Sequence, residues 1–313
     1  MNTQHSITYI GVDVCKGFLD TFSPKWSKAR RFSNEPKGIE KLLKALDNSP
    51  KPHLIVESTG GYERPLRIGA DQASMALSMI NPRQARDFAK ASGRLAKTDA
   101  LDAQLLANFG HTFEPQSAPL PSRKLQKLKS LVRRRFHLND LRIRESNQLE
   151  KTHETLICKD IQSLIKDLKA RIAKIEKSMI TLIDSKPSLA AKRQRLEQVK
   201  GVGPIVSATL IAELPELGSL KDPQIVALCG LAPFNRDSGK HQGKRTIIGG
   251  RGRIRRTLYM PTLCAIQYNA PLKAFYQRLT DNGKPGKLAV TAAMRMLICL
   301  LNRMLTDPDF QPA

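Results

Sequence analysis

Short apolar runs alternate with segments of helical spacing over the first hundred residues. The stretch "ITYIGVDVCKGFLDTFS" (7–23) holds two runs rich in β-branched and aromatic residues around a Gly/Lys turn, which predicts a β-hairpin that opens a sheet. The segment 38–46 repeats its apolar residues at the spacing of a helix. Segments 53–59 and 75–80 are short apolar runs that end in a glycine pair and in Asn-Pro, as strands do.

Helices are expected between these strands, up to about residue 74 and again from about residue 83. Strands interleaved with helices indicate an α/β domain with a central sheet over roughly residues 1–115. Three prolines in "EPQSAPLPS" (114–122) then mark a boundary, because proline ends helices and stiffens linkers.

The segment 125–183 has a different pattern, in which apolar residues recur in alternating steps of three and four. This spacing is a heptad seam. A helical hairpin that packs on its own body and a coiled coil between chains both explain the seam, and the spacing does not separate them. The seam is clearest at Ile161, Leu164, Leu168, Ile172, Ile175, Met179 and Leu182.

A third region begins near residue 190. In "LEQVKGVGPIVSATLIAEL" (196–214) two helical stretches are joined by Gly201, Val202 and Gly203. This resembles a helix-hairpin-helix element, in which glycine leaves backbone N–H groups open to a phosphate. A glycine helix cap followed by Pro204 in the first turn of the next helix explains the same letters. Further helices are expected to about residue 305.

These patterns predict three domains. Residues 1–118 form the α/β domain, residues 123–190 a central α-helical coiled-coil segment, and residues 191–313 a mainly α domain with the helix-hairpin-helix-like element.

The composition favours a nucleic-acid partner. The 313 residues include 52 Lys and Arg against 28 Asp and Glu, a formal net charge of +24, which suits a polyphosphate. The five cysteines form no C-x-x-C pair, which argues against zinc sites and a disulfide framework and favours a reducing cytoplasm. The N-terminus lacks a signal-peptide pattern, and the apolar segment 288–301 is short and carries Arg295, so no membrane role is implied.

The basic residues gather in two stretches. Residues 123–144 hold nine Lys and Arg against one Asp, and residues 240–259 hold eight basic residues, His241 included, and no acid. Glycines at 249, 250 and 252 suggest a loop that lies close to a nucleic-acid backbone. We expect nucleic acid to contact Arg133, Arg134, Arg135, Gly201, Gly203, Arg236, Lys240, Lys244, Arg245, Arg251, Arg253, Arg255 and Arg256.

Four acidic residues form the candidate metal site. In "KTDALDAQLL" (97–106) two aspartates, Asp99 and Asp102, lie three positions apart, where like charges on a helix repel by a few tenths of a kcal/mol. Asp13 lies in the first strand and Glu57 at the end of a later one. Carboxylates that converge from a hairpin, a strand and a helix can hold Mg²⁺. The alternative for the aspartate pair is an ordinary solvated helix face.

Several motifs together resemble the DEDD transposases of bacterial insertion sequences, relatives of the pilin-gene invertases. They are "GVDVCK", "VESTGGYE", "NPRQARDFAKASGRLAKTDALDA" and "GLAPFNRDSGKHQGKRTIIGGRGRIRR", and the resemblance covers nearly the whole chain. It implies a ribonuclease-H-like (RuvC-like) fold for the first domain. It places the acidic tetrad on Asp13, Glu57, Asp99 and Asp102, with Mg²⁺ or Mn²⁺ as the metal, and the nucleophilic serine on Ser238.

The resemblance also implies a mechanism and partners. The protein would excise and insert its own element through a covalent serine–phosphate intermediate on donor and target DNA, guided by a structured bridge RNA. It would act as a tetramer whose active site combines the tetrad of one subunit with the serine of another. The expected location is the bacterial cytoplasm, at the nucleoid.

Two other interpretations stay open at this point. In a metal-dependent Holliday junction resolvase, water would hydrolyse the strand, and Ser238-Gly239 would be a turn before a basic loop. In a non-catalytic nucleic-acid-binding protein, the acids would only form salt bridges with the many Lys and Arg residues.

Overall fold

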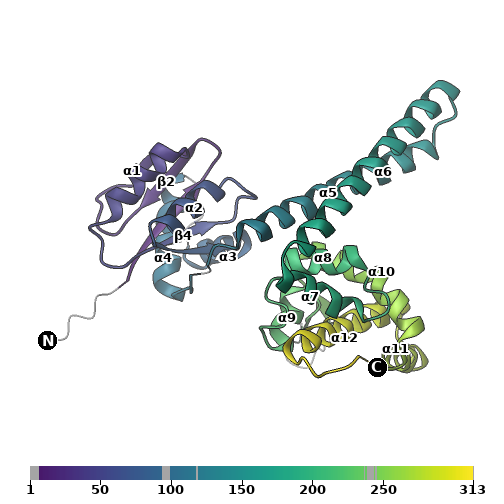
Figure 1. The fold of residues 1–313 in the computed structure, drawn as a ribbon. Helices are drawn as coiled ribbons and strands as arrows, with labels where there is room; N and C mark the ends of the chain where they lie inside the picture. The colour runs from purple at the N-terminus through teal and green to yellow at the C-terminus, as the bar shows by residue number, and fades with distance from the viewer. Residues whose placement is uncertain are drawn as a thin grey trace. The chain divides into compact units, whose positions relative to one another are not determined.

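The chain folds into two compact units, Met1–Pro121 and Ser122–Ala313, in a computed structural model (Figure 1). The structure describes residues 7–93, 99–117, 119–235, 237, 243 and 245–312, and at positions 99 and 100 the backbone alone. The division falls at the end of the proline-containing segment 114–122.

The first unit is built on a five-stranded mixed sheet in the order β3-β2-β1-β4-β5. The predicted hairpin is confirmed, since β1 pairs antiparallel with β2, and β1, β4 and β5 run parallel. β3 lies in a polar interval in which the sequence predicted no strand. The strands are β1 (Thr8–Val14), β2 (Phe18–Phe22), β3 (Arg30–Ser33), β4 (Pro52–Glu57) and β5 (Ala76–Ile80).

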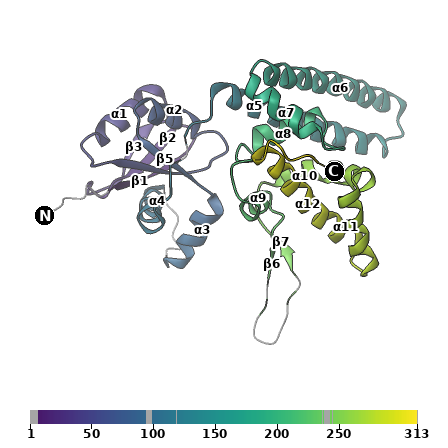
Figure 2. The same ribbon diagram turned by 60° about the horizontal axis from the view of Figure 1, so that its bottom comes forward.

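Helices cover both faces of the sheet (Figure 2). Ile10 and Val12 of β1 pack with the apolar sides of α1 (Pro36–Leu46) and α2 (Arg64–Gln72) on one face. Ile55 of β4 packs with α3 (Pro82–Ala91) and α4 (Asp99–Phe113) on the other. A mixed sheet between two helical layers is consistent with the predicted ribonuclease-H-like fold.

Helix α4 lies unusually close to the sheet. A Cβ atom added to Gly11 of β1 would clash with the carbonyl oxygen of Ala103 in α4. One added to Gly110 of α4 would lie 2.7 Å from Cγ1 of Ile55. Glycine therefore stands on both sides of the contact, because the two backbones approach to a distance that leaves no room for a side chain.

The second unit is mainly helical, as expected, and has one continuous hydrophobic core that runs from α5 to the C-terminal segment. Its elements are α5 (Arg123–Leu149), α6 (Thr155–Asp184), α7 (Pro187–Glu197), α8 (Pro204–Glu213), α9 (Asp222–Leu228), β6 (Pro233–Phe234), β7 (Thr246–Ile247), α10 (Gly252–Tyr268), α11 (Ala270–Asp281) and α12 (Gly286–Thr306).

Helices α5 and α6 form a hairpin and lie side by side (Figure 1). Ile161, Leu168 and Met179 of the predicted seam are buried, so α5 covers much of the heptad within one chain. At the base of the hairpin the seam joins the core of the unit. Leu164 of the seam and Leu156 near the tip are exposed. Pairing of this hairpin with another chain stays a prediction.

Helix α12 is the one described helix long and apolar enough to cross a membrane. Half of its most apolar window is buried within the protein, and Ala293, Leu297 and Leu301 belong to the core of the second unit. The length and apolar character of α12 are thus those of a central core helix.

We expect Gly11→Ala to lower the free energy of unfolding of the first unit by about 1–3 kcal/mol, because the added methyl group must push α4 away from β1. Trp26 is the only tryptophan of the chain and packs beside the core of this unit, so its fluorescence during urea unfolding of the full chain measures the change. Gly17→Ala is the control, since nothing lies within 4 Å of the added atom. Equal stability of the two variants would contradict the close contact.

Candidate functional site

Two of the predicted acids lie next to each other on the sheet. Val12 of β1 is in register with Val56 of the parallel strand β4, so Asp13 and Glu57 follow in neighbouring positions. Side chains alternate between the faces of a strand, and Asp13 and Glu57 therefore share the face of Gly11 and Ile55, which α4 covers. Both residues are partly buried at the carboxyl ends of their strands.

Helix α4 brings a third acid to this face. Gly11 contacts the backbone of Ala103, and Asp102 precedes that residue, so the first turn of α4 lies over the ends of β1 and β4. α4 begins at Asp99, whose side chain lies outside the described part of the chain. Both aspartates thus occupy the first turn, where the helix macrodipole favours acidic residues and offsets part of their repulsion.

Asp13, Glu57 and Asp102 come from three elements to one corner of the sheet, and their carboxylate oxygens are ligands of the kind that Mg²⁺ prefers. Each of the three makes an interaction within the protein. Among the described side chains, no group of three or more His, Cys, Asp or Glu is arranged to hold a metal ion. The four-carboxylate site stays a prediction.

Sequence reasoning missed one acid at this place. Asp20 of β2 is in register with Asp13 on the antiparallel strand, so the two share a face. Arg31 of β3 donates to both carboxylate oxygens of Asp20, from Nε at 2.9 Å and from Nη2 at 3.0 Å. This two-pronged ion pair gives Asp20 a structural partner of its own. The spacing of acids along the sequence gave no signal, because only strand pairing brings residues 13 and 20 together.

The predicted nucleophile, Ser238, lies outside the described residues, in the part of the sequence that connects β6 and β7. Phe234 of β6 pairs with Thr246 of β7 in an antiparallel ribbon. Within the connection, a carboxylate oxygen of Asp237 accepts a hydrogen bond of 3.0 Å from the backbone N–H of Gly243.

The base of this ribbon is fixed by close backbone contacts. Gly230 and Gly250 both have positive φ, and a Cβ atom on Gly250 would clash with the backbone nitrogen of Gly230. Nη1 of Arg255 donates to the carbonyl oxygens of Gly230 and Gly249, both at 3.1 Å. Gly250 and the carbonyl of Gly249 thus approach the protein's own backbone at Gly230, and Arg255 has a structural role there.

In the Gly201–Gly203 connection, Gly201 also faces the protein. Gly201 has φ of +98°, and a Cβ atom there would lie 2.6 Å from the carbonyl oxygen of Pro261 in α10. Gly203 is the N-cap of α8 with Pro204 in the first turn, and nothing lies within 4 Å of its open side. The structure thus shows the predicted helix with Pro204 in its first turn. A phosphate contact at Gly203 stays a prediction.

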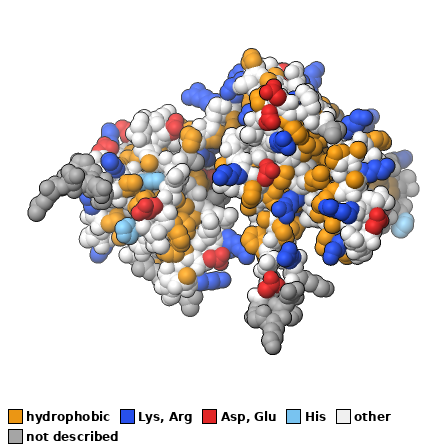
Figure 3. Space-filling model, turned by 90° about the horizontal axis from the view of Figure 1, so that it is seen from below, with side chains coloured by type: hydrophobic (Ala, Val, Ile, Leu, Met, Phe, Trp, Pro, Cys, Tyr) orange, Lys and Arg blue, Asp and Glu red, His pale blue; other side chains and the backbone are white. Residues whose placement is uncertain are grey.

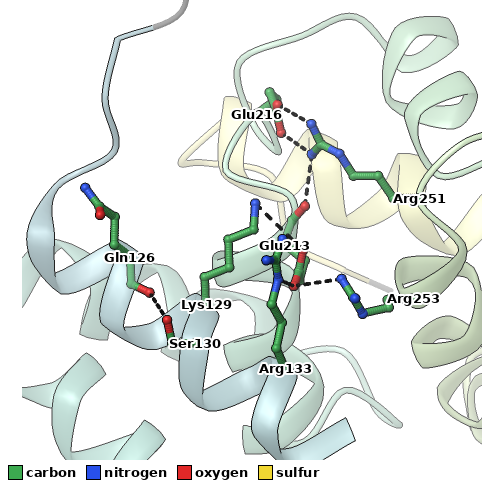
Figure 4. A network of polar contacts seen from close by, with 8 residues as sticks. All are labelled: Gln126, Lys129, Ser130, Arg133, Glu213, Glu216, Arg251 and Arg253. Atoms are coloured by element: carbon green, nitrogen blue, oxygen red, sulfur yellow. Dashed lines mark hydrogen bonds and ion pairs between the residues drawn. The ribbon is translucent and has the colours of Figure 1, made fainter. Parts of the chain in front are cut away.

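The two basic stretches meet on the second unit around acidic residues (Figure 4). Glu213, at the end of α8, lies within 4 Å of Lys129 and Arg133 from α5 and of Arg253 from α10. Arg251 donates to both carboxylate oxygens of Glu216 at 2.6 Å. Burial would raise the pKa of Glu216, but hydrogen bonds from Arg251 and from the backbone, and the charge of Arg251, outweigh burial and lower it.

Other arginines of the predicted nucleic-acid surface have partners within the unit as well. Nε of Arg135 lies 2.6 Å from Oε1 of Glu176, and Nη2 of Arg256 lies 2.8 Å from Oδ1 of Asp140. Nη1 of Arg134 lies 3.0 Å from Nδ1 of His137. Arg245 is exposed, whereas Arg236, Lys240 and Lys244 lie outside the described residues.

Cationic side chains lie among hydrophobic ones on the face shown in Figure 3. One groove of the second unit has this character, since Tyr259, Met260, Thr291 and Met294 line it beside Arg255 and Arg256, without an acidic residue. Sequence reasoning predicted the arginines here but not the exposed Tyr259, because periodicity alone does not separate a core aromatic from an exposed one.

Comparisons with known proteins agree with the resemblance in the sequence. A family described as Transposase matches residues 10–156, and the Transposase IS116/IS110/IS902 family matches residues 193–277. The Pilin gene-inverting proteins of Moraxella lacunata and Moraxella bovis are each 27% identical over 306 residues, 94% of both chains.

A protein of the insertion element IS116 from Streptomyces clavuligerus, described as uncharacterized, is 30% identical over 122 residues, 38% of this chain and 30% of that protein. Both transposase matches concern the same group of mobile elements, and each lies largely within one of the two units. The chain therefore belongs to the IS116/IS110/IS902 family of transposases, which are enzymes that act on DNA.

Proposed function

We propose that the protein excises and inserts an insertion-sequence element by cutting and exchanging DNA strands through a covalent phosphoserine intermediate. The observation that supports this most is the gathering of Asp13, Glu57 and the first turn of α4 at one corner of the sheet of a transposase. The Pilin gene-inverting proteins, by their name, act in DNA inversion, which is also a rearrangement of strands.

In this proposal Asp13, Glu57, Asp99 and Asp102 hold Mg²⁺, and Mn²⁺ suits the same oxygen ligands. A divalent ion bound there supplies polarisation of the scissile phosphate. The chain itself fixes the positions of these acids, because α4 packs on β1 at Gly11 and β4 pairs with β1.

Ser238 is the proposed nucleophile. Its Oγ forms a bond to phosphorus, the bond from phosphorus to one strand oxygen breaks, and the hydroxyl proton ends on the departing strand end. The phosphodiester is exchanged for a phosphoserine ester, so no ATP is consumed, and the free hydroxyl of a second strand later reverses the step. Arg236, Lys240, Lys244 and Arg245 would stabilise the charge that develops on the phosphate.

The proposed assembly is a tetramer in the bacterial cytoplasm, at the nucleoid, in which the tetrad and Ser238 of each site come from different subunits. A structured bridge RNA would pair with donor and target DNA. The large basic surface supports this, because it suits phosphate backbones of either nucleic acid, whereas base pairing supplies the sequence specificity.

Asp102→Asn should reduce strand exchange by about 100-fold or more, because a lost metal ligand removes several kcal/mol of stabilisation of the transition state. Product formation on DNA with element ends, in Mg²⁺, measures the effect. Asp87→Asn on the surface of α3 is the control. If neither protein exchanges strands and the variant binds nucleic acid and Mn²⁺ as the wild type does, the result would favour acids that only form salt bridges in a non-catalytic binding protein.

Denaturing electrophoresis of labelled DNA should reveal a protein–DNA adduct in the wild type that is absent in Ser238→Ala, because an alanine side chain offers no oxygen for the phosphoserine bond. Ser219→Ala, at an exposed serine elsewhere in the second unit, should retain the adduct. Metal-dependent cleavage without any adduct, unchanged in Ser238→Ala, would favour the junction resolvase.

RNA that co-purifies with the protein from its host should map to the flank of its own element if a bridge RNA guides it. Sequencing of that RNA is the measurement, with the RNA from a mock purification as the background. Enrichment of unrelated cellular RNA alone would contradict guidance.

A further inference from the structure

Glu213 occupies a place that elementary electrostatics disfavours. It is the last residue of α8, an apolar helix whose residues from Ser207 onward are all buried, and its own exposed fraction is 6%. Burial of a carboxylate costs several kcal/mol unless cations compensate it. The C-terminal end of a helix carries partial negative charge, so the macrodipole opposes a carboxylate there as well.

Three cations compensate this single charge. Nε of Arg133 lies 3.5 Å and Nη1 of Arg253 3.6 Å from Oε1, and Nζ of Lys129 lies 3.9 Å from Oε2 (Figure 4). Nε of Arg133 makes a long hydrogen bond to Oε1, and all three separations exceed the 2.7–2.9 Å of a typical charge-assisted hydrogen bond, so the cations are held loosely. The side chains of Lys129, Arg133 and Arg253 are 40%, 44% and 50% exposed.

The neighbouring acid, Glu216, brings a cation of its own, although the charge of Lys129 also acts on it. Glu216 is occupied by Arg251, whose Nη1 also donates to the backbone carbonyl oxygen of Glu213 at 2.9 Å. Arg251 thus caps the C-terminus of α8, and its charge and that of Glu216 cancel. Around Glu213 there remain three positive charges against one negative charge, on side chains that reach solvent.

Two helices supply the cations, which fixes their arrangement. Lys129 and Arg133 are four residues apart and lie on one face of α5, and Arg253 lies in the first turn of α10. Without an anion between them, three such charges repel and their long side chains spread into solvent. A buried carboxylate at their centre lowers this repulsion and keeps the three groups together before any ligand arrives.

We propose that Glu213 is a positioning residue that holds Lys129, Arg133 and Arg253 as a binding site for a phosphodiester group of nucleic acid. The inference rests on the proposed function, because it assumes that the second unit binds the nucleic acids on which the enzyme acts. The phosphate oxygens would accept hydrogen bonds from the outward-facing N–H groups of the three cations, and Glu213 would stay on their inner side.

Glu213→Gln separates this role from a simple effect of charge. The substitution makes the protein more positive by one unit, so charge alone predicts equal or tighter binding. Loss of the positioning carboxylate predicts the reverse, about tenfold weaker binding and a salt dependence reduced by about one or two phosphate contacts. Glu150→Gln, at an exposed position near the hairpin tip, makes the same change of charge and should not weaken binding.

Fluorescence anisotropy of the full-length protein with duplex DNA and, separately, with an RNA hairpin measures the affinities at several salt concentrations. Weaker binding to both nucleic acids supports one phosphate site that DNA and RNA share. Weaker binding to only one of them identifies whether DNA or RNA supplies the phosphate. Binding of Glu213→Gln as tight as that of the wild type on both, with unchanged melting of the helices by circular dichroism, would overturn the proposal. These affinities do not require strand exchange, so they can be interpreted even if the recombinase proposal fails.

A second pair of variants tests the proposed phosphate site if Glu213→Gln does not fold. Lys129→Gln and Lys159→Gln each remove one lysine from the helical hairpin, the first beside Glu213 and the second at an exposed place on α6. Lys129→Gln should bind about threefold or more weakly than Lys159→Gln. Equal affinities of the two variants would contradict the proposed site.

Discussion

The contact between the backbones of β1 and α4 is the constraint on which the first unit depends. At Gly11 the strand has no side chain, and the carbonyl of Ala103 occupies the space. The helix can therefore lie directly on the sheet, and its first turn comes to the carboxyl ends of β1 and β4. Any larger side chain would move this turn away from Asp13 and Glu57, which links a packing requirement to the candidate chemistry.

The second unit must accommodate a large excess of positive charge. It does so by giving many of its arginines internal partners, such as Glu176 for Arg135, Asp140 for Arg256 and Glu216 for Arg251. Each pair offsets the charge of one cation. Around Glu213 the balance differs, because three cations share one buried carboxylate, and the positive excess remains at the surface.

Several glycines that suggested contact with a phosphate have reasons inside the protein. Gly201 approaches α10, and Gly250 approaches Gly230 at the base of the β6–β7 ribbon. Both have positive φ, which glycine adopts without strain. A glycine-rich sequence predicts that the backbone closely approaches another group. It does not say whether that group belongs to a ligand or to another part of the chain.

The sequence by itself determined much of the architecture. Hydrophobic periodicity identified four of the five strands of the sheet, the long helices and the mainly helical second half, because burial of one face imposes a period on the letters. β3 was missed since its residues "RRFS" lie at a sheet edge, where few apolar side chains are needed.

Tertiary structure alone decided how these elements combine around the candidate sites. Strand pairing placed Asp13 beside Glu57 and Asp20, which no sequence spacing records, and the close approach at Gly11 added the first turn of α4. Packing of α5 and α10 against α8 brought Lys129, Arg133 and Arg253 to Glu213. The physical reason is that periodicity fixes which face of an element is buried, whereas the partner of that face depends on contacts between residues far apart in the chain.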